Sequence, residues 1–451
     1  MRATSRAVPN AMQNATNVAI VGSGISGLAC AWLLSQRYRV TLFEAAPRLG
    51  GHTNTVDVTL DGKTHPVDTG FLVFNEKTYP NLIALFATLG VESVQTEMSF
   101  AVSLENPDLE WAGSSLATVF GQKRNLLRPA FWTMLSDILR FNRESTAWLA
   151  VHPGDERPLG EFLKEGRYSD AFADWYLLPM AAAIWSCPTA QMRDMPLATF
   201  VRFCQNHGLL QIFDRPMWRT VRGGGREYVN KIAAQLDDVR LASPVQRVTR
   251  EASGLRVTHA HGSEVFDQVV LACHSDQSLA ILGETASAGQ REVLASVRYQ
   301  PNRAVLHTDA RLLPRDRKLW SAWNYFAGSG DPGEQPVGVS YLINRLQPLP
   351  FDTPVVVTLN PAREPDPEKV IAEFDYDHPI FDASAIAAQQ RLSDDTLGIQ
   401  GEGGVWLAGA WGRFGFHEDG LRSALRVANL MGIAAPWQKV PASLSPAVAR
   451  A

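Results

Sequence analysis

The chain has 451 residues, of which 45% are hydrophobic and 20% are charged, and its formal net charge at pH 7 is -4. This length exceeds one hydrophobic core, so we expect two or three compact units. The charge offers no basic excess for a nucleic-acid backbone, so we expect no nucleic-acid partner. Four widely spaced cysteines argue against a disulfide scaffold or zinc cage and favour a reducing compartment: Cys30, Cys187, Cys204 and Cys273.

The N-terminal stretch 1–16 is small and polar and has no apolar run, which predicts a disordered tail and no signal peptide. The most apolar run, 175–185, is too short to span a bilayer and contains Pro179. We therefore expect a cytoplasmic protein.

The first predicted element is a buried parallel strand over 18–21, followed by a helical pattern that begins near Ile25. Glycines occupy the joint between them, in the G-x-G-x-x-G spacing. In such a turn Gly22 permits the sharp bend, Gly24 lets a pyrophosphate approach the backbone, and Gly27 lets the helix pack on the strand. The stretch predicts a dinucleotide site at a helix N-terminus.

A second strand, "RVTLFE", ends at Glu44, where a carboxylate can accept both hydroxyls of an adenosine ribose. An acid at this position disfavours the 2'-phosphate of NADP. Two further glycine-bearing stretches follow, at 48–51 and 67–75. A nicotinamide domain has no need of them, whereas FAD extends well beyond its pyrophosphate and must be lined by backbone. The sequence therefore predicts FAD.

The stretch "VAIVGSGISGLACAWLLSQRYRVTLFEAAPRLGG" resembles the signature of the flavin-containing amine oxidoreductases, which include amine oxidases, protoporphyrinogen oxidases and phytoene-type desaturases. The resemblance returns in 266–282, "FDQVVLACHSDQSLAIL", and in 405–431, which contains "GFHEDGLRSA". The phrases "PMAAAIWSCP", "LHTD" and "SAWNY" are similar to a bacterial branch associated with cyclopropane and methyl-branched fatty acid synthesis. That branch is related to fatty acid isomerases.

This resemblance implies an α/β fold: a Rossmann-like FAD-binding domain with a discontinuous second α+β substrate domain. We expect the FAD-binding domain to gather 17–95, 215–290 and 400–435, and the substrate domain to gather 96–214 and 291–399. The implied FAD-binding residues are Gly22, Ser23, Gly24 and Gly27 at the pyrophosphate, Glu44 at the ribose, Arg48, Gly50 and Gly51 at the inner phosphate and ribityl chain, Val245 at the adenine, Gly409, Ala410 and Trp411 beside the flavin, and Gly420 and Leu421 where a helix begins. Val245 reads equally well as a core strand residue.

Three departures from the family pattern bear on the substrate. Ala410 stands where many relatives have an acid, and no lysine occurs between Val297 and Arg317, where amine oxidases tend to carry one. The paired tyrosines that flank an amine have only Trp411 and Phe416 as counterparts. A flat apolar slot over the flavin is the better expectation. The expected substrate pocket residues are Trp185, Cys187, Trp411 and Phe416, although Cys187 also reads as a buried structural cysteine.

His417, with Glu418 beside it, is the candidate for proton transfer, because desolvation next to a flavin can tune an acid or base. Histidines in motif stretches, such as His52 and His274, are more often structural. The sequence has no histidine pair with metal-ligand spacing beside the acids, and we expect no metal.

The block 123–149 alternates apolar and basic residues at helical spacing. It reads either as a helix packed on its own domain, the simpler interpretation, or as a peripheral contact with the inner face of an anionic membrane. Its apolar face would comprise Leu127, Phe131, Leu135, Ile138 and Trp148.

The sequence thus predicts an oxidoreductase with non-covalent FAD, which transfers a hydride between an apolar substrate and flavin N5. An unsaturated or methyl-branched fatty acyl chain is the favoured substrate, with desaturation or double-bond isomerisation as the reaction. Two alternatives remain open: a flavin amine oxidase, and a non-catalytic FAD-bound redox-responsive scaffold. The sequence makes no prediction about oligomeric state.

Overall fold

The computed structural model describes residues 16–155, 157–185, 188–211, 216–328 and 338–438. The predicted tail, except for Thr16, and the predicted pocket residue Cys187 lie outside these ranges. Within the described part of the chain, none of the helices combines the length and the hydropathy that a bilayer crossing requires.

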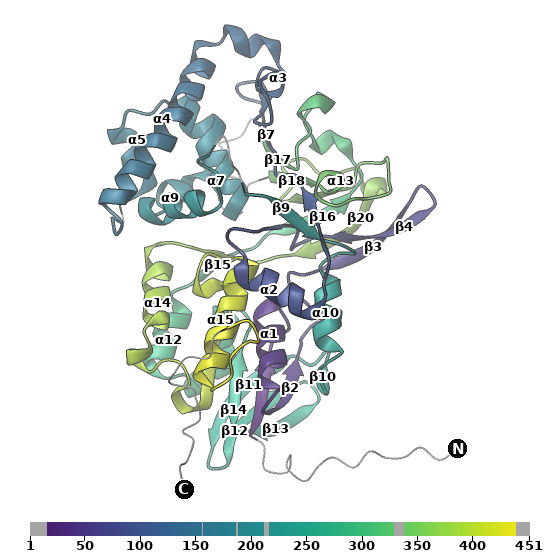
Figure 1. The fold of residues 1–451 in the computed structure, drawn as a ribbon, viewed down its shortest axis with the longest axis vertical. Helices are drawn as coiled ribbons and strands as arrows, with labels where there is room; N and C mark the ends of the chain where they lie inside the picture. The colour runs from purple at the N-terminus through teal and green to yellow at the C-terminus, as the bar shows by residue number, and fades with distance from the viewer. Residues whose placement is uncertain (1–15, 156, 186–187, 212–215, 329–337, 439–451) are drawn as a thin grey trace.

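A five-stranded parallel sheet organises the lower half of the molecule in Figure 1, with strand order β10-β2-β1-β14-β22. Its strands come from three distant stretches of the chain, as the sequence predicts. All the pairings are parallel, and Ala19 of β1 lies between Thr41 and Val269. The strands are β1 (Asn17–Val21), β2 (Arg39–Phe43), β10 (Asp238–Arg240), β14 (Gln268–Leu271) and β22 (Val405–Leu407).

Successive residues of β1 enter two different cores, because the side chains of a strand alternate between its faces. Val18 and Ile20 join a core built by four helices, and Ala19 and Val21 join a core on the opposite face. The helices of the first face are α1 (Ile25–Leu34), α2 (Pro80–Leu89), α10 (Arg226–Ala233) and α15 (His417–Leu430). The second face is covered by a three-stranded antiparallel sheet, β11 (Val245–Glu251), β12 (Gly254–His259) and β13 (Gly262–Phe266), and by α11 (Ser275–Leu282), α12 (Ala288–Ala295) and α14 (Ala383–Ser393).

The position of α12 and α14 corrects the expected domain boundaries. Both helices contribute to the core beneath the parallel sheet, where Leu294 and Leu392 pack with Leu271. The predicted substrate domain included 291–399, because the short amphipathic patterns of α12 and α14 do not indicate which of the two sheets each helix covers. The stretches around these helices belong with the nucleotide-binding half.

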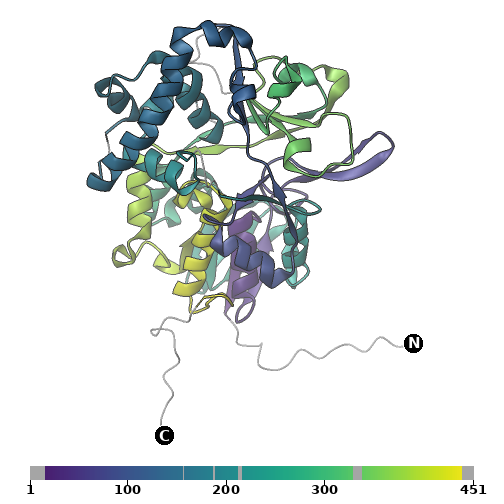
Figure 2. The ribbon, with the colours of Figure 1, turned by 45° about the horizontal axis from the view of Figure 1, so that its top comes forward.

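The other half contains a seven-stranded mixed sheet, with strand order β20-β16-β19-β18-β17-β7-β8, and a group of helices (Figures 1 and 2). Its strands are β7 (Phe100–Leu104), β8 (Leu109–Ala112), β16 (Arg303–His307), β17 (Trp323–Ala327), β18 (Gly338–Leu342), β19 (Val356–Leu359) and β20 (Val370–Asp375). The helices are α3 (Leu116–Val119), α4 (Pro129–Val151), α5 (Leu159–Glu165), α6 (Asp170–Phe172), α7 (Leu178–Trp185), α8 (Thr189–Arg193), α9 (Leu197–Asn206) and α13 (Ile343–Leu346).

The predicted membrane face of α4 packs largely on this core. Phe131 is fully buried, and Leu135, Ile138 and Trp148 are partly buried against the same cluster. The simpler interpretation of the block therefore holds for most of its length.

Smaller elements connect the halves: β3 (Thr55–Leu60), β4 (Lys63–Asp68), β5 (Phe74–Asn75), β6 (Ser93–Thr96), β9 (Trp218–Val221), β15 (Arg298–Gln300) and β21 (His378–Ile380).

Candidate active site

One large cavity, of about 1410 Å³, lies where the two halves meet. From the nucleotide-binding half it is lined by the turn after β1, the end of β2, the loops at 50–52 and 69–73, and the residues before α15. From the other half it is lined by side chains of β7, α7, α9 and β18. The carboxyl ends of the parallel strands open into it, which is where open α/β sheets bind ligands.

The glycine turn between β1 and α1 has the geometry that its spacing predicts. Gly22 has a φ of +99°, and its N–H donates to the carbonyl of Phe43 at 2.8 Å. A Cβ on Gly27 would lie 1.8 Å from the carbonyl oxygen of Gly22, so a side chain there would push α1 off the strand. A Cβ on Gly24 would meet no atom within 4 Å, because this position faces the cavity.

Glu44 lines the cavity at the end of β2 and is held in place by the glycine turn. Its Oε2 accepts from the backbone N–H of Ser23 at 2.9 Å and from the Ser23 hydroxyl at 2.5 Å. Its Oε1 accepts from the N–H of Ala46 at 2.8 Å. The carboxylate is thus fixed at the rim of the site.

The second glycine loop lies directly against the first. The N–H of Gly50 donates to the carbonyl of Ser23 at 3.1 Å, and a Cβ on Gly51 would lie 3.1 Å from the Cα of Gly24. The two loops together form a cradle of backbone. Arg48 is not among the residues that line the cavity, and its Nη1 lies 3.4 Å from the carbonyls of Leu49 and Thr53.

The C-terminal motif reaches the same cavity, with one correction to the predicted helix start. Gly409, Ala410 and Trp411 line the cavity, and so does Val245. However, α15 begins at His417, three residues before Gly420. Gly420 and Leu421 are therefore buried one turn inside α15 and do not line the cavity.

Gly420 serves the packing of α15 on α1 instead. A Cβ on Gly420 would lie 2.7 Å from Cγ2 of Ile25, and the Gly420 carbonyl accepts from the Ser26 hydroxyl at 3.0 Å. This contact joins residues 394 positions apart. The N-terminal glycine turn and the C-terminal helix therefore close on one cavity.

These features fit a flavin dinucleotide. A cradle of glycine backbone and a fixed carboxylate match the needs of a pyrophosphate and a ribose. Two buried ring nitrogens on the cavity, His52 Nε2 and Trp411 Nε1, have no hydrogen-bond partner within the described residues. A polar ring system in the cavity would supply partners for them.

The two residues proposed for proton transfer have other contacts. His417 lines the cavity, but its ring stacks on Phe71 at 3.7 Å and its Nε2 lies 2.8 Å from the Thr53 hydroxyl. Burial lowers the pKa of His417 to about 3, so its imidazole is neutral at pH 7. Proton transfer by His417 stays a prediction.

Glu418 lies behind the cavity and not on it. Its carboxylate accepts from the Asn81 side chain at 2.6 Å and from the backbone N–H of Leu82 at 3.0 Å, at the N-terminus of α2. It also pairs with Arg422 at 2.9 Å. We assign Glu418 to tethering α2 on α15, because acids favour helix N-termini, and we withdraw it as a proton donor.

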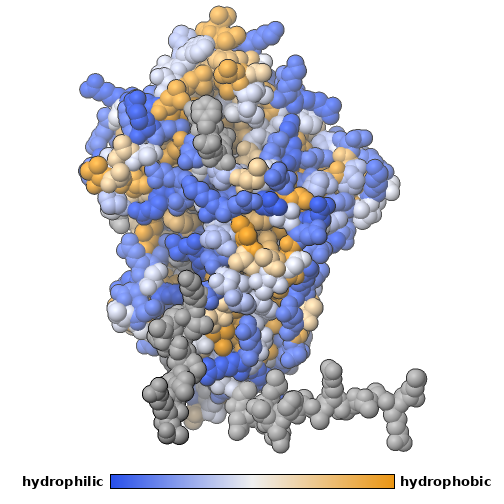
Figure 3. Space-filling model, viewed as in Figure 1, coloured by the Kyte–Doolittle hydropathy of each residue, from blue (hydrophilic) through white to orange (hydrophobic). Residues whose placement is uncertain are grey.

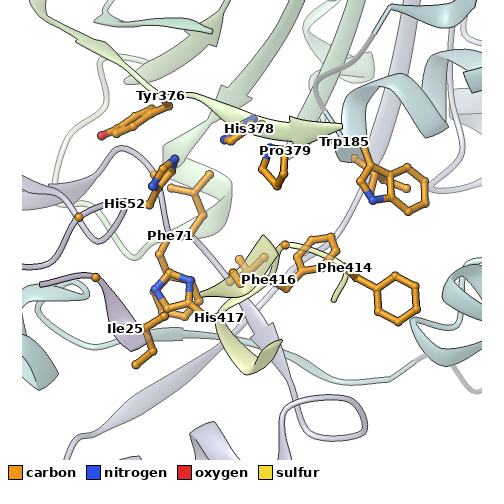
Figure 4. A pocket seen from close by; sticks show the side chains of 18 of the residues that line it. Ile25, His52, Phe71, Trp185, Tyr376, His378, Pro379, Phe414, Phe416 and His417 are labelled. Atoms are coloured by element: carbon orange, nitrogen blue, oxygen red, sulfur yellow. The ribbon is translucent and has the colours of Figure 1, made fainter. Parts of the chain in front are cut away.

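Sequence reasoning missed a histidine group on the other wall of the cavity, shown in Figure 4. The ring of His52 lies 5.0 Å from that of Tyr376 and 5.5 Å from that of His378. Burial lowers the pKa of His52 well below its usual range, and the neighbouring histidines lower it further. Burial also lowers the pKa of His378 to about 4. No sequence motif indicates His378, because it lies on a short strand, β21, that the sequence pattern does not distinguish from a loop.

The far part of the cavity is an apolar chamber. Trp185 contacts Phe203 at 4.6 Å between ring centroids, and Phe203 stacks on Phe416 at 5.2 Å. Phe414 approaches Phe203 at 6.0 Å, and Figure 4 shows Trp185, Phe414 and Phe416 on the same side of the cavity. Met180, Ile184 and Leu209 complete the lining. Of the predicted pocket residues, Trp185, Trp411 and Phe416 line the cavity.

Trp411 and Phe416 do not form a pair of facing rings. Trp411 is buried in the core beneath the sheet, with Leu392 and Ile399.

Among the described lining residues the carboxylates are Glu44, Glu97 and Asp377. Glu97 pairs with Arg345 at 3.1 Å. The apolar chamber itself thus carries aromatic and aliphatic groups. The described chain also contains no cluster of three His, Cys, Asp or Glu residues that could hold a metal ion.

Comparisons with known proteins agree with this geometry. A carotenoid phi-ring synthase of Streptomyces griseus is 26% identical over 311 residues, which cover 63% of this chain and 57% of that relative. Two solved structures match with TM-scores of 0.65: a putative protoporphyrinogen oxidase from Exiguobacterium sp. 255-15, at 18% identity, and a CLA-producing fatty acid isomerase from P. acnes, at 15% identity. Each match covers 92% of this chain and 98% of the other. A putrescine oxidase matches with a TM-score of 0.63 and 18% identity over the same shares.

At these identities the solved structures support the fold, and the chain spans little more than half the length of the carotenoid phi-ring synthase. The family profile is decisive, because the profile described as flavin containing amine oxidoreductase matches residues 25–431. That range begins at α1, directly after Gly22 to Gly24, and includes most of the residues that line the cavity and all of α15. The chain therefore belongs to the flavin-containing amine oxidoreductase family and is a flavin-dependent oxidoreductase.

Proposed function

We propose that the protein binds FAD non-covalently and acts on an unsaturated or methyl-branched fatty acyl chain, by desaturation or by double-bond isomerisation. The observation that carries this proposal is the continuity of one cavity, from the glycine cradle and Glu44 at one end to the chamber around Trp185, Phe203 and Phe416 at the other. An elongated apolar chamber beside a dinucleotide cradle suits a long hydrocarbon substrate.

The cradle residues would hold the cofactor. The backbone of Gly22 to Gly24 and of Gly50 to Gly51 would receive the phosphates, and Glu44 would accept the ribose hydroxyls. When bound, FAD supplies a hydride acceptor at N5. The cysteine thiols that the structure describes are buried or half-buried, and Cys273, on the cavity, has a pKa raised to about 11 by burial. That thiol is therefore a poor nucleophile for a covalent flavin link.

The chamber residues would orient the chain and exclude water. Rings at Trp185, Phe203 and Phe416 present flat apolar surfaces that a hydrocarbon can contact without desolvating a charge. His207, at the same chamber, has a pKa lowered to about 4 by burial, so it too is neutral at pH 7. A neutral wall favours a fatty acyl chain over an ammonium group.

We assign any accompanying proton to Nε2 of His52. This atom is buried on the cavity wall and has no partner within the described residues, whereas Nε2 of His417 is engaged by Thr53. Because His52 lines the cavity, a small rotation of its ring on substrate binding would present this nitrogen to a substrate carbon or an intervening water.

The similar proteins support an apolar substrate, because one is a fatty acid isomerase and another a carotenoid phi-ring synthase. The alternative is amine oxidation. It is favoured by the structural likeness to putrescine oxidase and by Asp377, a carboxylate on the cavity wall that could pair with an ammonium group.

Anaerobic spectroscopy of the purified yellow protein separates these functions. Acid precipitation should release the flavin into the supernatant as FAD. A cis-monounsaturated fatty acid and its methyl-branched counterpart, each free and within a phospholipid, are then mixed with the protein without oxygen. Bleaching indicates desaturation, and a shifted double bond without net bleaching indicates isomerisation. Bleaching by putrescine or cyclohexylamine alone would overturn the proposal in favour of amine oxidation, and no response to any of them would favour the scaffold.

A further inference from the structure

One end of the molecule carries exposed apolar side chains that the core does not use. Four of them form what we call the apolar patch: Leu116 on α3, Leu126 and Leu127 on the 3₁₀ helix η2 (Lys123–Leu127), and Trp132 at the start of α4. Their exposed fractions are 79%, 48%, 86% and 49%. Figure 3 shows hydrophobic surface gathered at the end of the molecule that α3 and α4 form. Contiguous exposed apolar surface marks an interaction site.

The apolar patch is held in place by ordered contacts. The indole N–H of Trp132 donates to the carbonyl of Leu126 at 3.0 Å, and its ring lies 5.1 Å from that of Phe120. Asn125, fully buried within η2, donates to the carbonyl of Glu110 at 3.2 Å. The backbone that carries Leu126 and Leu127 is therefore held in place by these contacts, and the exposure of their side chains is a property of the fold.

Cations outnumber acids beside the apolar patch, where the acids are Asp108 and the exposed Asp316 that caps η6. Lys123 is exposed on η2, and Arg317 and Lys318 are exposed on a second 3₁₀ helix, η6 (Arg317–Leu319). The helix η6 packs beneath the patch, because a Cβ on Gly121 would lie 2.6 Å from the Leu319 side chain. Asp108 is bound by both Arg124 and Arg315, which neutralise it. The surface beside the patch therefore has an excess of positive charge.

The active-site cavity reaches two of the same elements. Gly113, Ser114 and Thr118, which flank Leu116, line the cavity, and so do Lys318 and Trp320. The apolar patch therefore borders the part of the cavity wall that α3 and η6 supply.

We propose that this surface docks on an anionic phospholipid bilayer. The patch leucines and Trp132 would enter the boundary between headgroups and acyl chains, and Lys123 and Lys318 would contact lipid phosphates. A bilayer fits better than a second protein copy, because an apolar centre flanked by lysines that have no ion pair among the described residues complements acyl chains flanked by phosphates. In that orientation the part of the cavity wall that α3 and η6 supply faces the lipid.

Vesicle flotation with the flavin-loaded, full-length protein tests this. The vesicles contain one part phosphatidylglycerol and two parts phosphatidylcholine, or phosphatidylcholine alone. We expect binding to the anionic vesicles that weakens with salt. Changing Leu116→Ser together with Leu127→Ser should lower vesicle affinity at least tenfold. Changing Lys123→Gln together with Lys318→Gln should lower it about twentyfold, and only for anionic vesicles.

A matched control separates the apolar patch from general hydrophobicity. Leu139 and Val151 are exposed by 57% and 73% on the same helix, α4, but lie further along it. Changing both to serine should leave vesicle binding unchanged. The proposal is overturned if the wild-type protein does not bind anionic vesicles, or if this control loses as much affinity as the patch variant. It is also overturned if the wild type is a dimer that only the patch variant dissociates, because a second copy then covers the surface. Vesicle binding needs no turnover, so it is independent of the proposed reaction.

Discussion

The two glycines of the first turn, Gly24 and Gly27, lie three residues apart and should respond in opposite ways to alanine. Gly27→Ala would place a Cβ 1.8 Å from the Gly22 carbonyl oxygen, and only a shift of α1 away from β1, by about 1 Å, relieves such a contact. Overpacking of this kind costs about 1–3 kcal/mol, which exceeds the ~1 kcal/mol that alanine gains over glycine inside a helix. The difference is at most about 2 kcal/mol, so we expect Gly27→Ala to lower the melting temperature of the flavin-free protein by up to about 4–8 °C.

Gly24→Ala should leave the flavin-free protein nearly unchanged. Gly24 has φ -62° and ψ 178°, a conformation open to any residue, and a Cβ there meets no atom within 4 Å. The loss at a helix N-cap and the gain from a less flexible unfolded chain each amount to about 0.5–1 kcal/mol and offset each other. The methyl group would instead occupy the space we assign to the pyrophosphate, so flavin affinity should fall at least tenfold.

Differential scanning fluorimetry of the flavin-free variants and titration of flavin fluorescence measure the two effects separately. Excess FAD should raise the melting temperature of the wild type more than that of Gly24→Ala, because a ligand stabilises the fold by RT ln(1 + [L]/Kd), which is larger where the dissociation constant is smaller. Two results would contradict these roles of the glycines: Gly24→Ala destabilises the flavin-free protein as much as Gly27→Ala does, or Gly24→Ala retains flavin as the wild type does.

Three further predictions concern single side chains. His307 is fully buried, and its Nδ1 accepts from the backbone N–H of Asp309 at 3.0 Å. Burial lowers the pKa of His307 to about 4. Below pH 6.5 the imidazole therefore binds fewer protons in the folded protein than in the unfolded chain. Stability should therefore fall between pH 6.5 and 4, and urea unfolding of His307→Asn, which keeps an acceptor for that N–H, should show a shallower fall; an unchanged slope would contradict this. His52→Phe should slow anaerobic flavin reduction by substrate at least a hundredfold, and in the wild type the acid limb of the rate should begin well below pH 6.5, because the pKa of His52 is lowered. Phe416→Ala, which removes one of two rings stacked at 5.2 Å, should raise KM for a fatty acyl substrate about tenfold without altering the flavin spectrum, and an unchanged KM would remove Phe416 from the chamber.

The sequence predicted the nucleotide-binding half well because local patterns determine it. The strand, turn and helix around Gly22 and Gly27, and the acid at Glu44, follow from chain periodicity and steric need, and the structure places all three as expected. The sequence also predicted that a C-terminal motif returns to the same cavity.

The parts that failed depend on tertiary context. A capping role for Glu418 depends on where α2 lies, and α2 is more than 300 residues away in sequence. The start of α15 is a local exception: the Asp419 carboxylate accepts from the backbone N–H of Phe416 at 3.2 Å and caps the helix at His417, three residues before the predicted start. His378 reaches the cavity through a three-residue strand, and α12 and α14 cover a sheet whose strands lie elsewhere in the chain. Short elements and distant contacts leave no periodic signal to read.

The contact between Ser26 and Gly420 has a consequence for how the protein is made. A ribosome delivers the first glycine turn long before it delivers α15, and β22, the strand that completes one edge of the parallel sheet, also comes late. Until then β14 has an unpaired edge and α1 an uncovered apolar face, features that invite aggregation in newly synthesised chains. Capture of the cofactor must therefore wait until α15 has been synthesised, and a nascent chain truncated before β22 should need chaperone protection.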